Sequence, residues 1–384
     1  MVEISVVIPC LNEEKTVGRC IEKALQALKK YNLQGEVIVA DNGSYDNSQS
    51  IAIASGAQLI QASEKGYGAA LMSGVAHAHG EFVIMGDADD SYDFSQIFLF
   101  IEKLREGYDL VVGCRFPKGG GKIMPGAMPW KHRWIGNPIL TTIGKLFFHS
   151  PLSDFHCGLR AFRKSAYDQM DLRTTGMEFA SEMIIKASLL QMKVTEIPIT
   201  LYKDGRGRPS HLRSWRDGWR HLRFMLLFSP RWLFFIPGII LTAIGGLFTS
   251  VLLKGPIYIG HIGFDTNTLL VGCMLILVGI QLVMFAMFTK IFATLEGFLP
   301  QDYKMVLITK FMKLEVGIIA GLLFIILGIS LLIYGVIYWK NRSFGTLSYQ
   351  DSLRIVIPAT TTIVLGLQII FSSFFIGVLS LKRK

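Results

Sequence analysis

Four long stretches without a charged residue lie in the second half of the chain and restrict its fold more than any other feature. They cover residues 232–253, 268–288, 316–339 and 355–381. A helix needs about 20 apolar residues to cross the hydrocarbon core of a bilayer, and each stretch meets that requirement. The alternative, a set of core helices in a soluble domain, seldom requires uncharged runs of this length. We therefore predict an integral protein of the cell membrane, with a transmembrane domain of four helices over residues 232–384.

Basic residues beside these stretches indicate their orientation. They gather between the second and third stretches and at the end of the chain: Lys290, Lys304, Lys310, Lys313, Lys382, Arg383 and Lys384. Only Lys254 follows the first stretch. Because loops rich in Lys and Arg stay in the cytoplasm, we expect the first half of the chain and its C-terminus to be cytoplasmic. The loop between the third and fourth stretches, with Lys340, Arg342 and Arg354, fits this rule less well.

Composition excludes several other classes of protein. Hydrophobic residues make up 51% of the chain, so it is not a disordered chain. The five cysteines are an odd number without a Cys-x-x-Cys pair, which argues against a disulfide framework or a zinc ribbon and favours a reduced compartment. The apolar run 4–8 is too short for the core of a signal peptide, so we expect no cleaved export signal.

Residues 1–205 alternate short β-rich runs with amphipathic segments. We expect strands at 4–10, 36–42, 57–63, 82–87 and 109–115, and helices at 17–30 and 94–106 among the segments between them. This alternation predicts an α/β domain with a mostly parallel sheet and helices on both of its faces. In such sheets ligands bind beyond the carboxyl ends of the strands, so the residues that end each strand are the first candidates for a site.

Two acidic residues, Asp87 and Asp89, come just after the hydrophobic run 82–85. At a turn from strand to loop both carboxylates can reach one hard cation, Mg²⁺ or Mn²⁺, whose other ligands would come from a diphosphate and water. The alternative is a helix N-cap at Asp93 with the neighbouring acidic residues near the N-terminus of the helix. Three further polar motifs follow other strands, at residues 9–14, 41–46 and 65–70. They offer amides, carboxylates and glycines, as a nucleotide site requires.

With these motifs in this order, the first 200 residues resemble the family 2 glycosyltransferases of GT-A (Rossmann-like) fold. The matching segments read PCLNEE, ADNGSYDNS, KGYGAA and DAD. Within the family the chain is most similar to polyprenyl-phosphate glycosyltransferases, the dolichol-phosphate mannose or glucose synthases. That similarity rests on the segment Gly113-Cys114-Arg115, the glycine-rich loop 118–133 and the segment DFHCGLRAF at 154–162.

The resemblance implies roles for individual residues. Those implied to bind the nucleotide sugar are Pro9, Asn12, Glu13, Asp41, Lys65, Asp87 and Asp89, the last two also holding the metal. Those implied to act in catalysis, around the phosphates, sugar and acceptor, are Asp89, Arg115, Arg133, Asp154 and Glu182. The acceptor phosphate is implied to lie near Arg133, Asn137 and Arg160. Asn42 and Ser91 stand where relatives often have Asp and Gln, so the donor stays open between UDP-glucose and GDP-mannose.

Residues 206–231, between the two domains, are strongly basic. Trp215 and Trp219 recur with leucines at helical spacing, and an arginine stripe runs beside them. This pattern predicts a helix that lies in the membrane interface, with Arg206, Arg208 and Arg213 among the arginines that meet a lipid phosphate. A solvated cationic face that only obeys the charge rule for cytoplasmic loops is the alternative. Nucleic acid is not expected as a partner, because a basic stripe so close to a membrane span meets lipid first.

These observations together predict a metal-dependent, inverting transferase that moves one hexose from a nucleoside diphosphate to a polyprenyl phosphate. A processive polysaccharide synthase is the first alternative, but its Q-x-x-R-W motif is incomplete, since Phe228 precedes Arg231-Trp232 at the position of the Gln. A membrane transporter or scaffold that binds nucleotide sugar is the second, and the lack of ionisable residues in the apolar stretches disfavours it. Homo-oligomer formation stays open.

Overall fold

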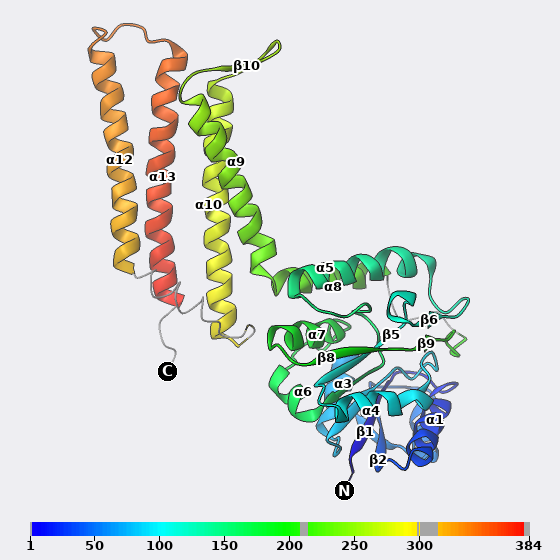
Figure 1. Cartoon of the computed structure of the whole chain (residues 1–384). Coiled ribbons are helices and arrows are strands. Elements are labelled where there is room, and N and C mark those ends of the chain that lie inside the picture. The colour runs from blue at the N-terminus through cyan, green and yellow to red at the C-terminus, as the bar shows by residue number, and fades with distance from the viewer. Residues whose placement is uncertain (1, 208–213, 298, 300–313, 380–384) are drawn as a thin grey trace. The chain divides into compact units, whose positions relative to one another are not determined.

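The computed structural model describes residues 2–207, 214–297, 299 and 314–379. The chain divides into two compact units, Met1–Met225 and Leu226–Lys384. The first unit holds a sheet surrounded by helices, and the second consists of long helices (Figure 1).

Seven strands form the sheet of the first unit. They are β1 (Ile4–Cys10), β2 (Gly35–Asp41), β3 (Gln58–Gln61), β4 (Phe82–Met85), β5 (Leu110–Cys114), β7 (Arg160–Arg163) and β8 (Val194–Pro198). Their order in the sheet is β3-β2-β1-β4-β7-β5-β8. All neighbouring strands run parallel except that β7 lies antiparallel between β4 and β5. The predicted α/β class with a mostly parallel sheet is therefore confirmed.

The burial of the strands follows from their place in the sheet. Strand β1 has neighbours on both sides and is buried along its whole length, as its almost uninterrupted apolar sequence requires. Edge strand β3, by contrast, has two exposed glutamines and no fully buried residue. A separate short parallel pair joins β6 (Lys122–Ile123) to β9 (Thr200–Leu201).

Eight α-helices belong to the described part of the first unit. They are α1 (Val17–Lys30), α2 (Ser48–Ala54), α3 (Tyr67–Ala76), α4 (Ile97–Arg105), α5 (Asn137–Phe148), α6 (Lys164–Met170), α7 (Phe179–Leu189) and α8 (Ser214–Leu227), whose last two residues pass into the second unit. Helix α1 buries Val17, Ile21, Ala24 and Leu28, the apolar stripe expected of an amphipathic helix packed on a sheet.

The second unit contains four helices that are long and apolar enough to cross a membrane, so the prediction of four spans is confirmed at this level. They cover Arg231–Leu252, Thr266–Leu295, Leu314–Lys340 and Tyr349–Leu379. The first begins with a π-type turn, Arg231–Phe235, and continues as α9 (Ile236–Leu252); the others are α10, α12 and α13. A hairpin of β10 (Ile257–Ile259) and β11 (Ile262–Phe264) joins α9 to α10.

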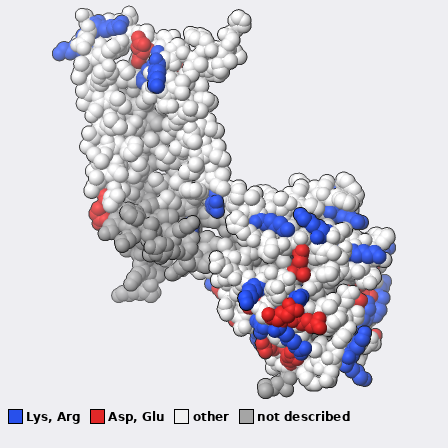
Figure 2. Space-filling view, viewed as in Figure 1, with Lys and Arg blue, Asp and Glu red and all other residues white. Residues whose placement is uncertain are grey.

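Small residues allow these helices to pack closely in pairs. A Cβ added at Gly245 would lie 2.4 Å from the carbonyl oxygen of Gly272, and one at Gly328 would lie 2.7 Å from that of Ala359. Such close backbone approach is typical of helix pairs within a bilayer, where no hydrophobic driving force brings helices together. Along the flank of this unit Figure 2 shows no charged atoms; they appear only toward its ends.

Candidate active site

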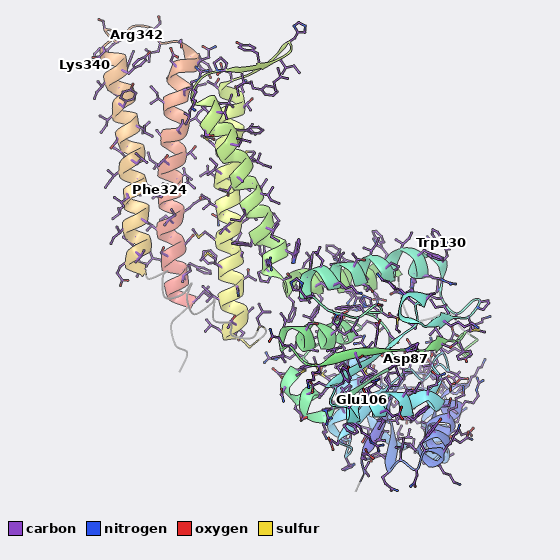
Figure 3. All side chains as sticks on the ribbon, in the orientation of Figure 1. Asp87, Glu106, Trp130, Phe324, Lys340 and Arg342 are labelled. Atoms are coloured by element: carbon purple, nitrogen blue, oxygen red, sulfur yellow. The ribbon has the colours of Figure 1, made fainter. Side chains whose placement is uncertain are left out.

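The order of the strands fixes the position of the candidate site. Strands β2 and β3 lie on one side of β1, and β4 lies on the other, so the direction of strand addition reverses between β1 and β4. Ligands of open α/β sheets bind at such a reversal, beyond the carboxyl ends of the strands. The residues there are 9–13 after β1 and 86–89 after β4, and Figure 3 marks the position of Asp87.

Asp87 and Asp89 each accept hydrogen bonds from a neighbouring side chain. The phenolic oxygen of Tyr67 donates to Asp87 Oδ1 at 2.9 Å. Ser91 donates to Asp89 Oδ1 through both its amide, at 3.0 Å, and its hydroxyl, at 2.5 Å. The other oxygen of Asp89 pairs with the guanidinium of Arg206, which also reaches Glu13 Oε1 at 3.3 Å. Arg206 therefore joins the ends of β1 and β4.

The two aspartates influence each other. Burial, followed by the negative charge of Asp89, raises the pKa of Asp87 from 3.8 to about 6. Two carboxylates that repel each other are stabilised by a cation between them.

This pair fits a divalent metal ion. Both offer carboxylate oxygens, the donors that Mg²⁺ and Mn²⁺ prefer. Among the described residues no three His, Cys, Asp or Glu side chains form a complete metal cage. Mg²⁺ is commonly held by one or two carboxylates, with phosphate and water as its other ligands, so two aspartates are sufficient.

The other two acidic residues of this loop have structural partners. Asp90 pairs with Lys23 at 2.6 Å and Arg19 at 3.3 Å, both on α1. Asp93 accepts a hydrogen bond from the amide of Ser95 at 3.0 Å and caps the short helical turn Phe94–Gln96. The capping role considered for Asp93 is thus confirmed, and it leaves Asp87 and Asp89 as the candidate ligands.

The loops after β1 and β2 are tied to each other. The amides of Asn12 and Glu13 donate to the hydroxyls of Ser44 and Ser48, at 2.9 and 2.7 Å. The side chain of Asn12 in turn accepts from the amide of Tyr45 at 2.9 Å. These loops, with Arg206, line a cavity of about 260 Å³.

Asp41, at the end of β2, keeps one acceptor available. Its Oδ2 accepts from the amides of Gly43 and Ser44, both at 3.0 Å, and from Gln49 at 2.9 Å. Its Oδ1 is buried and has no hydrogen-bond partner among the described residues. Such an unpaired buried oxygen is costly, and a ligand donor would satisfy it. Of the other predicted nucleotide residues, Pro9 lies within β1 and Lys65 is exposed.

The glycines of the third motif, residues 65–70, contact another segment of the protein. A Cβ at Gly66 would lie 2.1 Å from the carbonyl oxygen of Thr175, and one at Gly68 would lie 2.3 Å from that of Thr174. The close approach that these glycines permit is therefore to the segment 174–175, and it holds the start of α3, with Tyr67, beside Asp87.

Glu182 holds this same segment in place. It accepts from the amide and hydroxyl of Thr174, at 2.8 and 2.6 Å, and pairs with Lys186 at 3.0 Å. The carboxylate is almost completely buried. In this arrangement Glu182 supports the segment that contacts the start of α3.

Asp154 is also held in an ion pair. It forms a two-pronged ion pair with Arg115, with distances of 2.6 and 2.8 Å, and accepts from the amide of Arg115 at 3.1 Å. Asp154 is fully buried and Arg115 is 8% exposed. Burial disfavours the charged form of Arg115, but Asp154 outweighs it and the pKa of Arg115 is raised.

The predicted acceptor residues that the structure describes have different surroundings. Arg160 is completely buried and donates to the carbonyl oxygens of Cys157, Phe155 and Ala180, so it faces the interior and does not meet a lipid phosphate. Arg133 is half-buried, with its guanidinium 5.3 Å from the ring centre of Trp134. Asn137 begins α5. Arg206 lies on the carboxylates of the donor side instead, and Arg208 and Arg213 lie outside the described residues.

Helix α8 has one buried face and one exposed face. Asp217 and Met225 are buried, while Trp215 and Trp219 are 93% and 57% exposed. Other exposed apolar residues occur just before and within α5, among them Trp130, Trp134 and Ile139, and Figure 3 marks Trp130 at the surface.

Two contacts were not predicted from the sequence. Tyr67 stands in the KGYGAA motif, but nothing in the motif indicates its bond to Asp87. A pair of histidines, His156 and His221, has ring centres 4.8 Å apart, and Ser181 lies 2.8 Å from His221 Nδ1. Their sequence positions are 65 residues apart, so no local pattern signals the contact.

Comparisons with known proteins find relatives of both units of the chain. The model of glycosyl transferase family 2 matches residues 5–171, and that of the glycosyltransferase family 2 C-terminal transmembrane region matches residues 287–380. The low-salt glycan biosynthesis hexosyltransferase Agl6 of Haloferax volcanii is 37% identical, over 97% of this chain and 88% of its own length. The dolichyl-phosphate hexose transferase of the same organism is 26% identical, over 51% of this chain and 82% of its own.

Among solved structures, the chain is similar to glucosyl-3-phosphoglycerate synthase from Mycobacterium tuberculosis in complex with Mn²⁺, UDP and glucosyl-3-phosphoglycerate. The TM-score is 0.46 with 22% sequence identity, and the match covers 59% of this chain and 79% of the other.

Proposed function

This chain belongs to glycosyltransferase family 2, and from that premise we propose that it moves one hexose, glucose or mannose, from a nucleoside diphosphate to a polyprenyl phosphate. The four apolar helices make it a membrane glycosyltransferase. The names of its relatives support both halves of the proposal, because one is a hexosyltransferase and another a dolichyl-phosphate hexose transferase.

The proposal of a phosphate acceptor rests on one observation, the ion pairs formed by two buried carboxylates. A sugar hydroxyl that attacks an anomeric carbon needs a general base. Asp154 and Glu182, the two candidates, are both buried in ion pairs, with Arg115 and Lys186. A phosphate monoester has a second pKa of about 6 and is already largely dianionic at neutral pH, so it attacks without a base. The lack of a free base at either position therefore favours a phosphate acceptor.

On the donor side, Asp41 and the loop after β1 would hold the base and ribose, with the free Oδ1 of Asp41 as an acceptor. Asp87 and Asp89 would hold Mg²⁺ or Mn²⁺. The ion would neutralise the charge that develops on the departing diphosphate. One displacement at the anomeric carbon inverts its configuration.

On the acceptor side, α8 exposes Trp215, Trp219, Arg216 and Arg223, which suit the headgroup region of a membrane, so we propose that this helix lies in the interface. The basic residues that flank the spans favour a cytoplasmic location for the catalytic unit. The polyprenyl phosphate would then be drawn from the cytoplasmic leaflet.

The test is direct transfer by the purified protein. UDP-glucose or GDP-mannose is incubated with polyprenyl phosphate and Mg²⁺ or Mn²⁺, and the lipid product is analysed by mass spectrometry. We expect a lipid-linked monosaccharide that disappears with a chelator and with Asp89→Asn. Asp93→Asn is the matched control, because Asp93 only caps a short turn, and it should keep most of the activity. A polymeric product, or no product with any common donor, would refute the proposal.

A further inference from the structure

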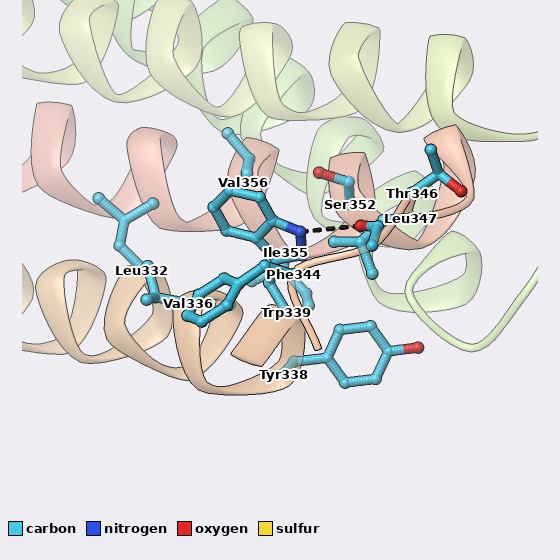
Figure 4. Close-up of a pocket in the computed structure, with 12 residues that line it drawn as sticks. Leu332, Val336, Tyr338, Trp339, Phe344, Thr346, Leu347, Ser352, Ile355 and Val356 are labelled. Carbon is cyan, nitrogen blue, oxygen red and sulfur yellow. Dashed lines mark hydrogen bonds between the residues drawn. The ribbon is translucent and has the colours of Figure 1, made fainter. Parts of the chain in front are cut away.

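An open apolar groove of about 790 Å³ lies between α12 and α13, at the end of the pair where a loop connects them (Figure 4). Leu332, Val336 and Trp339 line it from α12, and Ile355 and Val356 line it from α13. Leu332 and Lys340 are eight residues apart on one helix, so the groove extends about 12 Å below the charged end of α12. That depth corresponds to a short length of hydrocarbon chain.

The groove arises because close packing of the two helices stops before their connecting loop. A Cβ at Gly321 or Gly328 would overlap the partner helix, at 2.5 Å from Ile370 or Ile363. Two turns further along, a Cβ at Gly335 would meet only the side chain of Ile355, at 3.2 Å. Pro358, inside α13, lacks the N–H that would bond to the carbonyl of Arg354.

The loop over the groove has a defined shape. Ser343 and Phe344 both adopt left-handed backbone conformations, with φ of 51° and 56°, which are unfavourable for residues other than glycine. The indole N–H of Trp339 donates to the carbonyl of Gly345 at 2.9 Å, and its ring meets that of Phe344 edge-on at 5.0 Å. These contacts keep the mouth of the groove open and hold an aromatic wall beside it.

Two cations stand at this mouth, and the charge rule for membrane loops does not explain them. Lys340 ends α12, and Arg342 lies in the loop, its guanidinium 5.3 Å from the ring centre of Tyr338 and 3.1 Å from its hydroxyl. Arg354, the third basic residue of this connection, pairs with Asp265 beside α10. That pair accounts for Arg354 and leaves Lys340 and Arg342, which Figure 3 marks together at the end of α12.

We propose that this groove binds one anionic phospholipid of the leaflet opposite to the one where α9 begins. The lipid's acyl chain lies between α12 and α13, and its phosphate meets Arg342 and Lys340. The occupant follows from the combination of features: none of the described lining residues is charged, and Lys340 and Arg342 lie at the loop end of α12. The half-buried Asp351, in the first turn of α13, is the acidic residue that follows them in the chain. A guanidinium recognises phosphate through paired hydrogen bonds. The inference does not depend on the proposed function.

The experiment measures lipid binding to the full chain in detergent by native mass spectrometry. Phosphatidylglycerol, phosphatidylcholine and a polyprenyl phosphate are titrated separately. We expect one phosphatidylglycerol to bind more tightly than either other lipid. The double variant Lys340→Gln/Arg342→Gln should weaken its binding about 30-fold, as expected for the loss of two cations near an anionic headgroup. Lys254→Gln is the matched control, because it removes an exposed cation at the same end of the unit without touching the groove, and it should bind as the unchanged protein does.

A second variant tests the apolar part. Gly335→Phe fills the groove and keeps both cations, and it should also weaken binding. Equal binding of phosphatidylcholine, an equal loss in Lys254→Gln, or unchanged binding in the double variant would overturn the proposal. Preferential binding of the polyprenyl phosphate would overturn the assignment to a phospholipid.

Discussion

Arg206 occupies the position where a positive charge is most needed between the strand ends. It pairs with Asp89 and Glu13 and so provides, in the protein alone, part of the neutralisation that a divalent ion would provide. A cation cannot use the same carboxylate oxygen without displacing this guanidinium. We therefore expect Arg206 and the metal to compete for Asp89.

The variant Arg206→Gln should bind Mn²⁺ more tightly than the unchanged protein in the absence of nucleotide. A hydrogen bond to a charged group contributes roughly 1.5–3 kcal/mol. In this variant Mn²⁺ no longer has to displace that bond, so its affinity should rise about tenfold or more. Titration followed by electron paramagnetic resonance measures it directly. Arg19→Gln is the control, since Arg19 pairs at 3.3 Å with Asp90 and not with Asp89. Equal or weaker Mn²⁺ binding by Arg206→Gln would show that the two cations do not compete.

A second prediction at single residues concerns pH. Burial lowers the pKa of both His156 and His221 below the ordinary value of 6.5, and their mutual repulsion and nearby arginines, Arg160 among them, lower it further for His156. Glu178 and Asp217 oppose this for His221 but do not reverse it. Both histidines are therefore neutral in the folded protein near neutral pH.

The sign of the effect follows from proton uptake. Above pH 6.5 neither the folded nor the unfolded protein protonates these rings, so their contribution to stability is complete. As the pH falls from 6.5 toward the lowered values, only the unfolded chain binds the protons, and stability drops by up to about 1.4 kcal/mol per pH unit for each ring. Thermal unfolding between pH 7.5 and 5 should show this loss. It should be smaller in His221→Asn and unchanged in His77→Gln, where the side chain is exposed. Identical slopes in all three proteins would contradict it.

The sequence predicts which strand ends meet in the candidate site, but it does not predict the contacts within it. Parallel strands end at one edge of a sheet, so the acidic pair, the Asn-Glu loop and Asp41 could be grouped from the alternation of strands and helices alone. The sequence predicts Arg206 at the acceptor, because its neighbours in the sequence are basic and precede the membrane. Its contact with Asp89 spans 117 residues, and no local pattern carries that information. The resemblance implies the same place for Arg160, and only the fold reveals that its N–H groups donate to three carbonyl oxygens.

Among the helices and strands, long periodic segments were predictable and short ones were not. The five expected strands appear as β1 to β5, and the amphipathic segment 17–30 forms α1 with the same bounds. Strand β7 has the sequence Arg-Ala-Phe-Arg, only four residues with a charge at each end, and it runs antiparallel within the sheet. Its pairing is decided by the gap between β4 and β5, which is a property of the assembled sheet.

The packing of α12 on α13 can be tested with two glycine-to-alanine variants, which should change the stability of the protein in opposite directions. Gly321→Ala would place a Cβ 2.6 Å from the carbonyl oxygen of Gly366, so the two helices must move apart. Overpacking of this kind costs about 1–3 kcal/mol. Gly246→Ala, on α9, meets nothing within 4 Å and should stabilise by up to about 1 kcal/mol, because alanine favours a helix over glycine. Thermal unfolding of both proteins in the same detergent makes the comparison. Equal shifts would indicate that α12 and α13 do not pack as described.

Across the whole molecule, the distribution of charge sets the expected topology. Each of the four spans is uncharged over the length that a bilayer requires, and an even number of crossings returns both ends of the chain to one side. The β10–β11 hairpin follows the first predicted crossing, so we expect it on the face of the membrane opposite to the start of α9. The basic residues between the second and third spans favour the cytoplasm for the catalytic unit and the exterior for the hairpin.

Thiol labelling can decide this topology, because all five native cysteines are buried and should react slowly. Tyr258 in β10 is 72% exposed, and Glu106 after α4 is exposed in the catalytic unit. In intact cells a membrane-impermeant maleimide should label Tyr258→Cys and leave Glu106→Cys unlabelled, and both should react once the membrane is permeabilised. Labelling of Glu106→Cys alone in intact cells would place the catalytic unit outside, where nucleotide sugars made in the cytoplasm do not reach it. Labelling of both would mean that the first span does not cross the membrane.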